Sequence, residues 1–513
     1  MKVYAFEPIG FDGELVTVEV DLRRGIPAVD IVGLPDGAVK ESRERVRASI
    51  RNSGYEFPLD RLLINLAPAG LRKAGASFDL PIALAVLVAS GQVPDFGDDV
   101  LAMGELELSG AIRGVPGILP AVAAGLAAGV KRFLVPLSNV LEARVLAGTG
   151  AFGMERLAEA SGLSAAMRGG TDARSSQPVP VAVEEELYRF TDDLADIRGQ
   201  PRLRRALEVA AAGGHHLLLF GPPGAGKTMA ARRLPGLLPD LEDTDAIAST
   251  KLHSLAGVLP LRSGLLRRPP FRTPHHSAST EGVVGGGKIK KPGEISLAHG
   301  GVLFLDEAPE FRIDVLQALR EPLEEGMVSI ARADRTVRYP SAFTLVLACN
   351  PCPCGNLGRQ GGICLCSHEE IRKYWKRLGG PLLDRVDIRV PVKPTDPREL
   401  ASPSGESTDV VKERVRLARE IQNRRYHSDQ WKVNARLPPG GMGAYCSFDG
   451  DARSLFIARS SEGGLSSRAS HGVLRVARTL ADLVGAATIG LDHLDEAFSL
   501  RHYGDEDLFW QIP

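Results

Sequence analysis

The 513-residue sequence lacks a long hydrophobic run, an excess of either charge, and a dense set of cysteines. Its longest apolar stretches, residues 80–89 and 119–130, are too short to span a membrane. Lysine plus arginine (62) nearly equals aspartate plus glutamate (63), so any nucleic-acid contact requires a local basic patch. The chain opens without a signal-peptide pattern and has six cysteines, which predicts a cytoplasmic protein without disulfides and without a membrane partner.

The most informative stretch is an apolar run followed by a glycine-rich turn. Residues 217–220 are typical of a buried strand, and residues 221–228 match the phosphate-binding pattern G-x-x-x-x-G-K-T. In this loop, backbone N–H groups surround phosphate oxygens at the start of a helix. We predict that Lys227 reaches the β- and γ-phosphates of ATP and that Thr228 binds Mg²⁺. The predicted nucleotide-binding residues here are Gly221, Pro222, Pro223, Gly224, Ala225, Gly226, Lys227, Thr228 and Met229.

Two further apolar runs end in polar side chains. Residues 301–305 precede Asp306 and Glu307, which we predict to order the Mg²⁺ ion and to polarise the attacking water, respectively. Residues 345–349 precede Asn350, which we predict to orient that water; the alternative is a turn residue, since Asn-Pro favours turns. Together with the phosphate loop, these residues predict an enzyme that hydrolyses a nucleoside triphosphate.

Two other segments complete the predicted nucleotide site. Ile197, Gly199 and Gln200 lie about twenty residues before the phosphate loop and resemble the adenine-contacting segment of AAA+ ATPases. Arg385 is our candidate for an arginine that a neighbouring subunit inserts to stabilise charge on the transferred phosphate. The alternative for Arg385 is an ion pair with Asp384 or Asp387.

The first 167 residues have the pattern of an α+β domain. Strands are predicted at residues 16–20, 61–66, 103–108 and 132–136, and helices at 38–52, 79–90 and 121–128. Residues 73–77, 104–106, 110–114 and 129–136 resemble the proteolytic domain of the Lon family, which has a ribosomal-S5-like fold. Ser77 falls at that family's serine position, but the position of its lysine partner falls near Leu119. We therefore expect a domain without protease activity, in which Ser77 is a turn or helix-cap residue.

The longest motifs resemble one family across nearly the whole chain. Residues 271–276, 285–287, 291–299, 302–311, 350–355 and 382–385 are similar to the ComM/YifB group of magnesium-chelatase-like AAA+ ATPases. After a linker at residues 168–184, the resemblance implies a P-loop core with a doubly wound parallel sheet (185–393) and a C-terminal helical lid (394–513). It also implies a hexameric ring and ATP-driven branch migration or unwinding of DNA in recombination or natural transformation.

Other functions of this family remain open. One alternative is a magnesium-chelatase-type ATPase that remodels a protein or porphyrin partner, and another is a regulatory ATPase whose Lon-like domain binds proteins. In the lid, Arg468 matches the family's sensor-two arginine, and Arg475 is the second candidate. The chain departs from the family at Ser470 and Gly472, where tyrosine and arginine are expected.

Two basic segments of the core are candidates for DNA contact. Residues 326–339 are predicted to form a hairpin with Arg332 and Arg335 near its tip, and the glycine-rich segment 285–291 carries Lys288, Lys290 and Lys291. Such residues would follow a phosphate backbone through the pore of a ring. The alternative is a pair of solvated charged loops.

The cysteine spacing indicates a metal site. Cys352, Cys354, Cys364 and Cys366 form two C-x-C pairs that would wrap a structural Zn²⁺ ion, with His368 as a spare ligand; the alternative is free thiols. His275 and His276 are adjacent and are expected to point in different directions, which favours a hydrogen-bonding or nucleotide-sensing role over metal binding.

Overall fold

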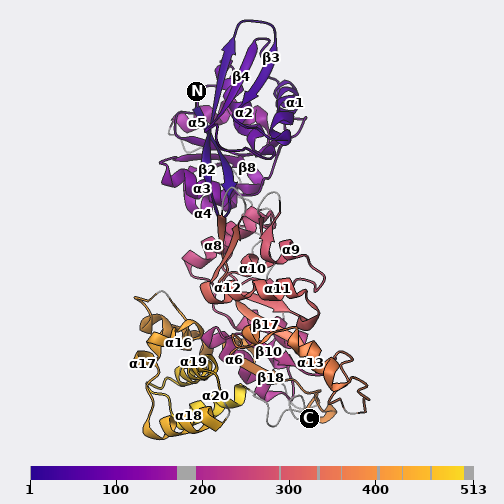
Figure 1. The fold of residues 1–513 in the computed structure, drawn as a ribbon. Coiled ribbons are helices and arrows are strands. Elements are labelled where there is room, and N and C mark those ends of the chain that lie inside the picture. The colour runs from indigo at the N-terminus through magenta and orange to yellow at the C-terminus, as the bar shows by residue number, and fades with distance from the viewer. Residues whose placement is uncertain are drawn as a thin grey trace.

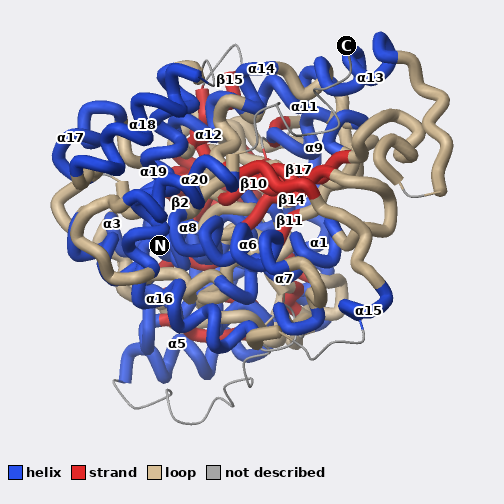
Figure 2. Tube along the Cα trace, turned by 90° about the horizontal axis from the view of Figure 1, so that it is seen from below, coloured by secondary structure: helices blue, strands red, loops and turns tan. Residues whose placement is uncertain are grey.

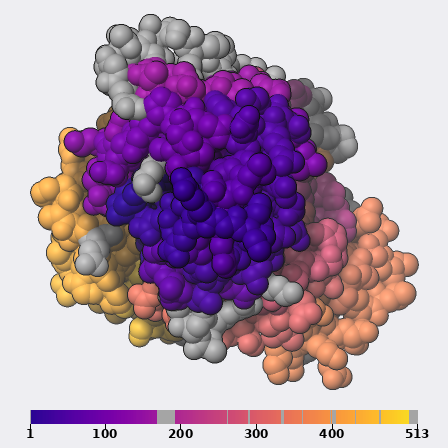
Figure 3. Space-filling view, turned by 90° about the horizontal axis from the view of Figure 1, so that it is seen from above, coloured from indigo at the N-terminus to yellow at the C-terminus, as the bar shows by residue number. Residues whose placement is uncertain are grey.

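The computed structural model describes residues 2–169, 192–260, 262–287, 291–331, 336–359, 361–400, 405–429, 431–462 and 465–501. The molecule is elongated, with the N-terminal domain at one end, the core in the middle and the lid beside the far end of the core (Figure 1). Viewed from the N-terminal end, that domain covers the centre, and the lid emerges on the side opposite residues near 370 (Figure 3). Within the described residues, no helix has the length and apolar character needed to cross a membrane.

The N-terminal domain is built on a seven-stranded mixed sheet. Its strand order is β3-β4-β2-β1-β5-β8-β9, in which β2 pairs antiparallel with β1 and β4 and the other neighbours are parallel. The strands are β1 (Lys2–Ile9), β2 (Asp12–Arg23), β3 (Ala28–Val32), β4 (Arg61–Ala67), β5 (Val100–Ala102), β8 (Arg132–Pro136) and β9 (Ala151–Met154).

Five helices complete this domain: α1 (Gly37–Asn52), α2 (Asp79–Ala89), α3 (Ile118–Ala127), α4 (Val140–Ala147) and α5 (Ala160–Gly169). Helix α2 is buried over nearly its whole length, because it is apolar on every face. The strand predicted at 103–108 is much shorter: β6 (Glu105–Leu106) pairs only with β7 (Ile112–Arg113). Ser77 lies in the single turn Ala76–Phe78 immediately before α2.

The core contains a five-stranded parallel sheet with the order β11-β14-β17-β10-β18. These strands are β10 (Leu217–Phe220), β11 (Phe271–Arg272), β14 (Val302–Leu305), β17 (Thr344–Cys349) and β18 (Ile388–Pro391). Strands β10, β14 and β17 are fully buried, as expected when helices cover both faces. Because all strands are parallel, the residues that follow them meet at one edge of the sheet.

Helices cover both faces of the core sheet (Figure 2). On one face lie α6 (Pro201–Gly213) and α7 (Lys227–Leu237), and on the other lie α11 (Ile313–Ala318), α12 (Arg320–Glu325) and α14 (Gly380–Leu383). Alternate residues of β10 pack to opposite faces: Leu217 and Leu219 to the first, Leu218 and Phe220 to the second. The remaining named core elements are α8 (Asp243–Ala256), α9 (Thr280–Val284), α10 (Glu294–Leu297), α13 (His368–Lys376), α15 (Pro397–Leu400), β12 (Gly285–Gly286), β13 (Lys291–Pro292), β15 (Met327–Ala331) and β16 (Thr336–Pro340).

The lid is helical: α16 (Thr408–Arg425), α17 (Met442–Tyr445), α18 (Gly450–Glu462), α19 (Ser467–Leu483) and α20 (Leu491–Leu500). Residues 438–444, a proline- and glycine-rich segment, contain a 3-10 turn (Pro439–Gly441) and the start of α17. Gly472 of α19 packs against the core, where an added Cβ would lie 2.5 Å from Arg501 Nη1 and 2.7 Å from Asp387 Oδ1. The arginine expected from the family at position 472 therefore has no room here.

The N-terminal domain docks on α8 and on the β15–β16 hairpin. The backbone N–H of Gly117 donates to Ser254 Oγ (2.9 Å), and Ser254 Oγ donates to the buried carboxylate of Glu142. A Cβ added at Gly10, in the β1–β2 turn, would lie 2.8 Å from Cβ of Val337 on β16. The hairpin therefore contacts the N-terminal domain close to its tip end, where Val337 pairs with Ile330.

Candidate nucleotide site

Residues 221–228, here called the P-loop, follow β10 as predicted. The Lys227 Nζ donates to Gly221 O (2.7 Å), Pro222 O (3.0 Å) and Asn350 Oδ1 (3.1 Å). Gly224 and Gly226 have φ angles of 78° and 93°, which only glycine adopts without strain. Burial lowers the pKa of Lys227, although the nearby acidic groups oppose that shift. The structure therefore brings Lys227 and Asn350 together at the mouth of the loop.

The predicted metal-binding residues also meet. The Thr228 hydroxyl donates to Asp306 Oδ2 (2.7 Å), and the Glu307 backbone N–H donates to Asp306 Oδ1 (3.0 Å). A hydroxyl and a carboxylate oxygen are the hard ligands that Mg²⁺ prefers, so this pair fits the ion. Glu307 has a φ of 50°, which is uncommon for a residue with a side chain, and its carboxylate is half exposed.

The histidine pair differs from the expectation. The centroids of the His275 and His276 rings lie 4.1 Å apart with an angle of 34° between the ring planes, so the rings lie close together in a tilted arrangement instead of diverging. The pair lies in a loop after β11, where the alternation of side chains along a strand does not apply. His276 Nδ1 is 3.7 Å from Glu307 Oε2, and His275 Nδ1 is 2.7 Å from Ser277 Oγ.

The segment predicted to contact adenine touches the P-loop. Gln200 Nε2 donates to Ala225 O and to Thr395 Oγ1, both at 3.1 Å. Ile197 is fully buried, and Gly199 has a φ of 65° with the side chain of Glu399 so close that a Cβ would collide with it. Thr395 and Glu399 were missed in the sequence, because no local pattern indicates a contact between residues 195 positions apart.

The two predicted catalytic arginines lie together. Both Arg385 and Arg468 donate to the same oxygen of Glu324, which is on α12. Arg385 therefore forms neither of the ion pairs considered from the sequence. Burial lowers the pKa of Arg385, and the Arg468 guanidinium holds the pKa of Glu324 below its usual range. Arg475, the second candidate, instead donates to Leu437 O (2.9 Å) inside the lid.

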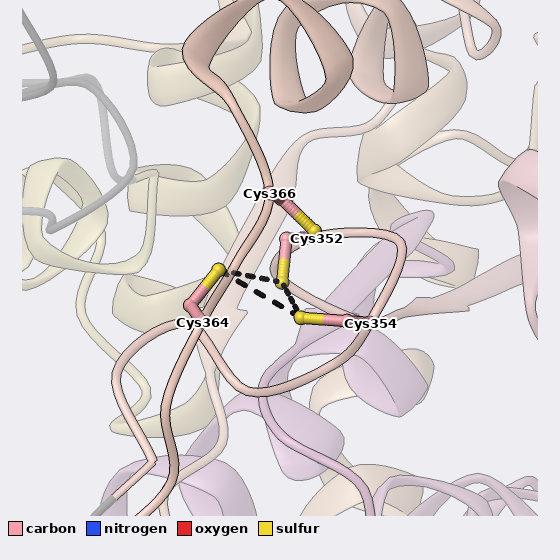
Figure 4. A group of neighbouring side chains, drawn as sticks. All are labelled: Cys352, Cys354, Cys364 and Cys366. Carbon is pink, nitrogen blue, oxygen red and sulfur yellow. Dashed lines mark hydrogen bonds between the residues drawn. The ribbon is translucent and has the colours of Figure 1, made fainter.

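The four cysteines converge on one point (Figure 4). Cys352 Sγ lies 3.4 Å from Cys354 Sγ and 3.7 Å from Cys364 Sγ, and the sulfurs of Cys354 and Cys364 are 3.7 Å apart. Including Cys366, all four sulfurs lie within 4.8 Å of one another. Hydrogen bonding from the backbone N–H of Asn356 lowers the pKa of Cys354 to about 6, whereas burial raises the pKa values of Cys352 and Cys366.

The DNA-contact candidates are described only in part. Lys288, Lys290, Arg332 and Arg335 lie outside the described residues. Lys291 is exposed on β13, and its Nζ is 3.3 Å from Ala256 O at the end of α8. The strands on either side of the predicted hairpin tip pair as expected, from Met327 with Pro340 to Ala331 with Thr336.

A parallel sheet in the order β11-β14-β17-β10-β18, with a P-loop after β10 and carboxylates after β14, defines a P-loop nucleotide-binding protein of the AAA+ type. Three family profiles match: "Magnesium chelatase, subunit ChlI" (residues 193–400), "Subunit ChlI of Mg-chelatase" (18–139) and "Magnesium chelatase, subunit ChlI C-terminal" (405–501).

The matching relatives extend over almost the full chain. YifB of Escherichia coli is 42% identical over 502 residues, which cover 97% of this chain and 96% of that protein. The competence protein ComM of Haemophilus influenzae is 40% identical over 510 residues, 97% of each chain. A magnesium-chelatase 38 kDa subunit of Rhodobacter capsulatus is 27% identical over 326 residues, 58% of this chain and 83% of that protein. The chain belongs to the ComM/YifB family of magnesium-chelatase-like AAA+ ATPases.

Proposed function

We propose that this protein is an ATP-driven ring motor that acts on single-stranded or branched DNA, in the manner of branch migration during recombination or natural transformation. The observation that carries the proposal is the position of its arginines. Arg385 and Arg468 bind Glu324 on the α12 and α14 side of the sheet, whereas the P-loop leads into α7 on the opposite side (Figure 2). This separation supports the proposal that the two arginines complete a neighbouring subunit's site.

Each residue of the P-loop site has a defined task in this proposal. Thr228 and Asp306 would hold Mg²⁺, which supplies positive charge to the phosphate oxygens when bound. Lys227 would exchange its present oxygen partners for phosphate oxygens. Glu307 would accept a hydrogen bond from the attacking water, and Asn350 would orient that water. Arg385 and Arg468 of the adjacent subunit would stabilise the charge that develops on the transferred phosphate.

A site shared between subunits favours a closed ring. The P-loop side of one subunit must face the arginine side of the next, and this head-to-tail contact closes only when the rotation between subunits completes a circle. We propose a hexamer, in accord with the family resemblance. In that ring, Glu324 releases the two arginines when a neighbour's nucleotide replaces it as their anionic partner.

The basic segments support DNA as the substrate. Lys291 on β13 and Arg338 on β16 are exposed, and both flank the candidate basic residues at 288–290 and 332–335. Cationic side chains on two segments of the core suit the phosphate backbone of DNA without requiring a particular base sequence.

We propose Zn²⁺ as the ion of the four-cysteine cluster. Four sulfurs bound at ~2.3 Å around a tetrahedral zinc ion lie about 3.8 Å from one another. The sulfur separations of 3.4 to 3.7 Å among Cys352, Cys354 and Cys364 are close to that geometry, and Cys366 brings all four sulfurs within 4.8 Å of one another. Four thiolates leave no open coordination position, so the ion would have a structural role.

The decisive experiment measures the ATPase rate with and without forked or four-way-junction DNA at two salt concentrations. Lys227→Ala provides the blank. We expect strong stimulation that weakens as salt rises, because phosphate contacts release counterions. Lys291→Ala should reduce the stimulation. The control is Lys432→Ala, which removes an exposed cation of the lid that pairs with Glu242 of the core, and this variant should keep the stimulation. An intact basal rate without DNA stimulation would refute the DNA motor and favour a chelatase-type partner, either protein or porphyrin.

A further inference from the structure

The chain that follows β17 touches the nucleotide site at three separate points. Asn350 accepts a hydrogen bond from Lys227 (3.1 Å). Pro351 O accepts one from Trp375 Nε1 (3.1 Å), and the Trp375 ring packs edge-on against Phe220, the residue before the P-loop, with ring centroids 6.1 Å apart.

The third contact is the closest. Gly355 has a φ of 76°, and a Cβ at this position would lie 2.7 Å from Pro223 Cγ and 2.9 Å from its Cδ. Real side-chain carbons do not approach that closely. Only glycine at position 355 therefore allows residues 350–367, here called the cysteine loop, to lie against the P-loop. Pro223 is within the loop that is predicted to surround phosphate, so a shift of the cysteine loop would move it directly.

The cysteine loop has little else to hold it in place. Among its described residues, 350–359 and 361–367, there is no helix or strand. Of its three large apolar side chains, Leu357 is half-buried, and Ile363 and Leu365 are 77% and 88% exposed, so together they form little core. The cluster of four sulfurs is the feature that joins the two arms of the loop, Cys352 and Cys354 with Cys364 and Cys366 (Figure 4).

We propose that the four-cysteine site is a metal-dependent positioning element of the ATP site, which fixes Asn350 and Pro223 although its ion does not touch nucleotide. This inference rests on the proposed ATPase function and on zinc as the ion. When the ion is bound, the two arms are joined and the loop supports the P-loop from outside. When it is removed, the arms separate, and both Pro223 and Asn350 lose their support. The protein therefore hydrolyses ATP efficiently only in its zinc-loaded form.

A pair of glycine substitutions separates this role from general folding. Gly355→Ala keeps all four cysteines but inserts a methyl group into the contact with Pro223. Gly361→Ala is the matched control, because Gly361 has a nearly equal φ of 72° in the same loop and an added Cβ there meets no atom within 4 Å. Both variants should contain one zinc ion per chain by elemental analysis. We expect Gly355→Ala to lower kcat at least tenfold and to speed hydrogen exchange of the P-loop, and Gly361→Ala to match the parent in both measurements.

Removal of a ligand tests the metal itself. Cys354→Ser and Cys364→Ser should lose zinc and show the same two defects as Gly355→Ala, with folding checked by circular dichroism. Equal kcat and equal P-loop exchange in Gly355→Ala and Gly361→Ala would overturn the coupling, and so would cysteine variants that lose zinc yet keep both parental values. A parent protein without zinc would overturn the metal requirement. If the parent hydrolyses ATP no faster than Lys227→Ala, the proposed function fails, while hydrogen exchange still decides the coupling.

Discussion

Replacing Ser254 by alanine is expected to loosen the N-terminal domain from the core. Ser254 lies near the end of α8, accepts a hydrogen bond from the Gly117 N–H (2.9 Å) and donates one to Glu142. Glu142 has two further donors, the Leu119 N–H (2.8 Å) and Asn139 Nδ2 (3.0 Å). The substitution therefore leaves the buried Glu142 carboxylate with two of its three donors. It also removes the Ser254 hydroxyl as an acceptor for the Gly117 N–H.

The size of the effect depends on pH. A hydrogen bond to an ionised group contributes about 1.5–3 kcal/mol, and one between neutral groups about 0.5–1.5 kcal/mol. Burial raises the pKa of Glu142 above its ordinary value of 4.5. A carboxyl with a raised folded-state pKa destabilises the fold when ionised, and this cost disappears as pH falls through that pKa towards the unfolded value. Ser254→Ala should thus destabilise by about 1.5–3 kcal/mol where Glu142 is ionised, and by about 0.5–1.5 kcal/mol at pH values below its folded-state pKa, where it is neutral.

The matched control is Ser249→Ala on the same helix. The Ser249 hydroxyl is also buried, but within the described residues it has no hydrogen-bond partner. We expect its removal to leave stability unchanged or slightly increased, as measured by urea unfolding over a series of pH values. Equal losses in the two variants, or a loss in Ser254→Ala that does not change with pH, would refute the assignment of Glu142 as an ionised acceptor at the domain interface.

Further substitutions test the ATP site and the lid. Arg385→Ala should lower kcat by about 10³-fold with little change in the affinity for a fluorescent ATP analogue, because a finger arginine acts on the transition state; a large loss of affinity would contradict this role. Mixing Arg385→Ala with Lys227→Ala should restore part of the activity, since some interfaces then contain an intact P-loop and an intact arginine; no recovery would argue against a shared site. Arg468→Ala should also lower kcat, whereas Arg475→Ala, which removes a bond to Leu437 O, should chiefly lower the melting temperature. Gly472→Arg should destabilise the protein by about 3 kcal/mol through overpacking beside Arg501, as measured by thermal unfolding; an unchanged melting temperature would show that the lid can move away from the core.

The core of the site was predictable from the sequence because its signals are local. Strands β10, β14 and β17 are continuous apolar runs; β10 is followed by the P-loop motif that contains Lys227, and β14 and β17 are followed directly by Asp306 and Asn350. Parallel strands bring these residues to one edge of the sheet, so Lys227, Asp306 and Asn350 meet without further information.

Contacts between distant residues were not predictable in this way. Glu324 receives Arg468 from 144 residues away, and only the packing of the lid against the core brings them together. The fit of Gly355 against Pro223 likewise depends on the path of an irregular loop. Strand β11 has only two residues, which is too short for periodicity to reveal, and the helical turns at 439–445 are formed by a glycine-rich sequence that locally favours a loop.

The position of Lys227 affects the entropy cost of binding nucleotide. Its ammonium group already lies against three oxygen atoms, arranged by two backbone carbonyls and Asn350. A free lysine side chain loses up to ~2 kcal/mol of conformational entropy when it is immobilised. Here that entropy is already lost when the protein folds. When phosphate arrives, the Lys227 ammonium exchanges its present oxygen partners for phosphate oxygens. The ordered lysine therefore makes this part of the site preorganised for its ligand.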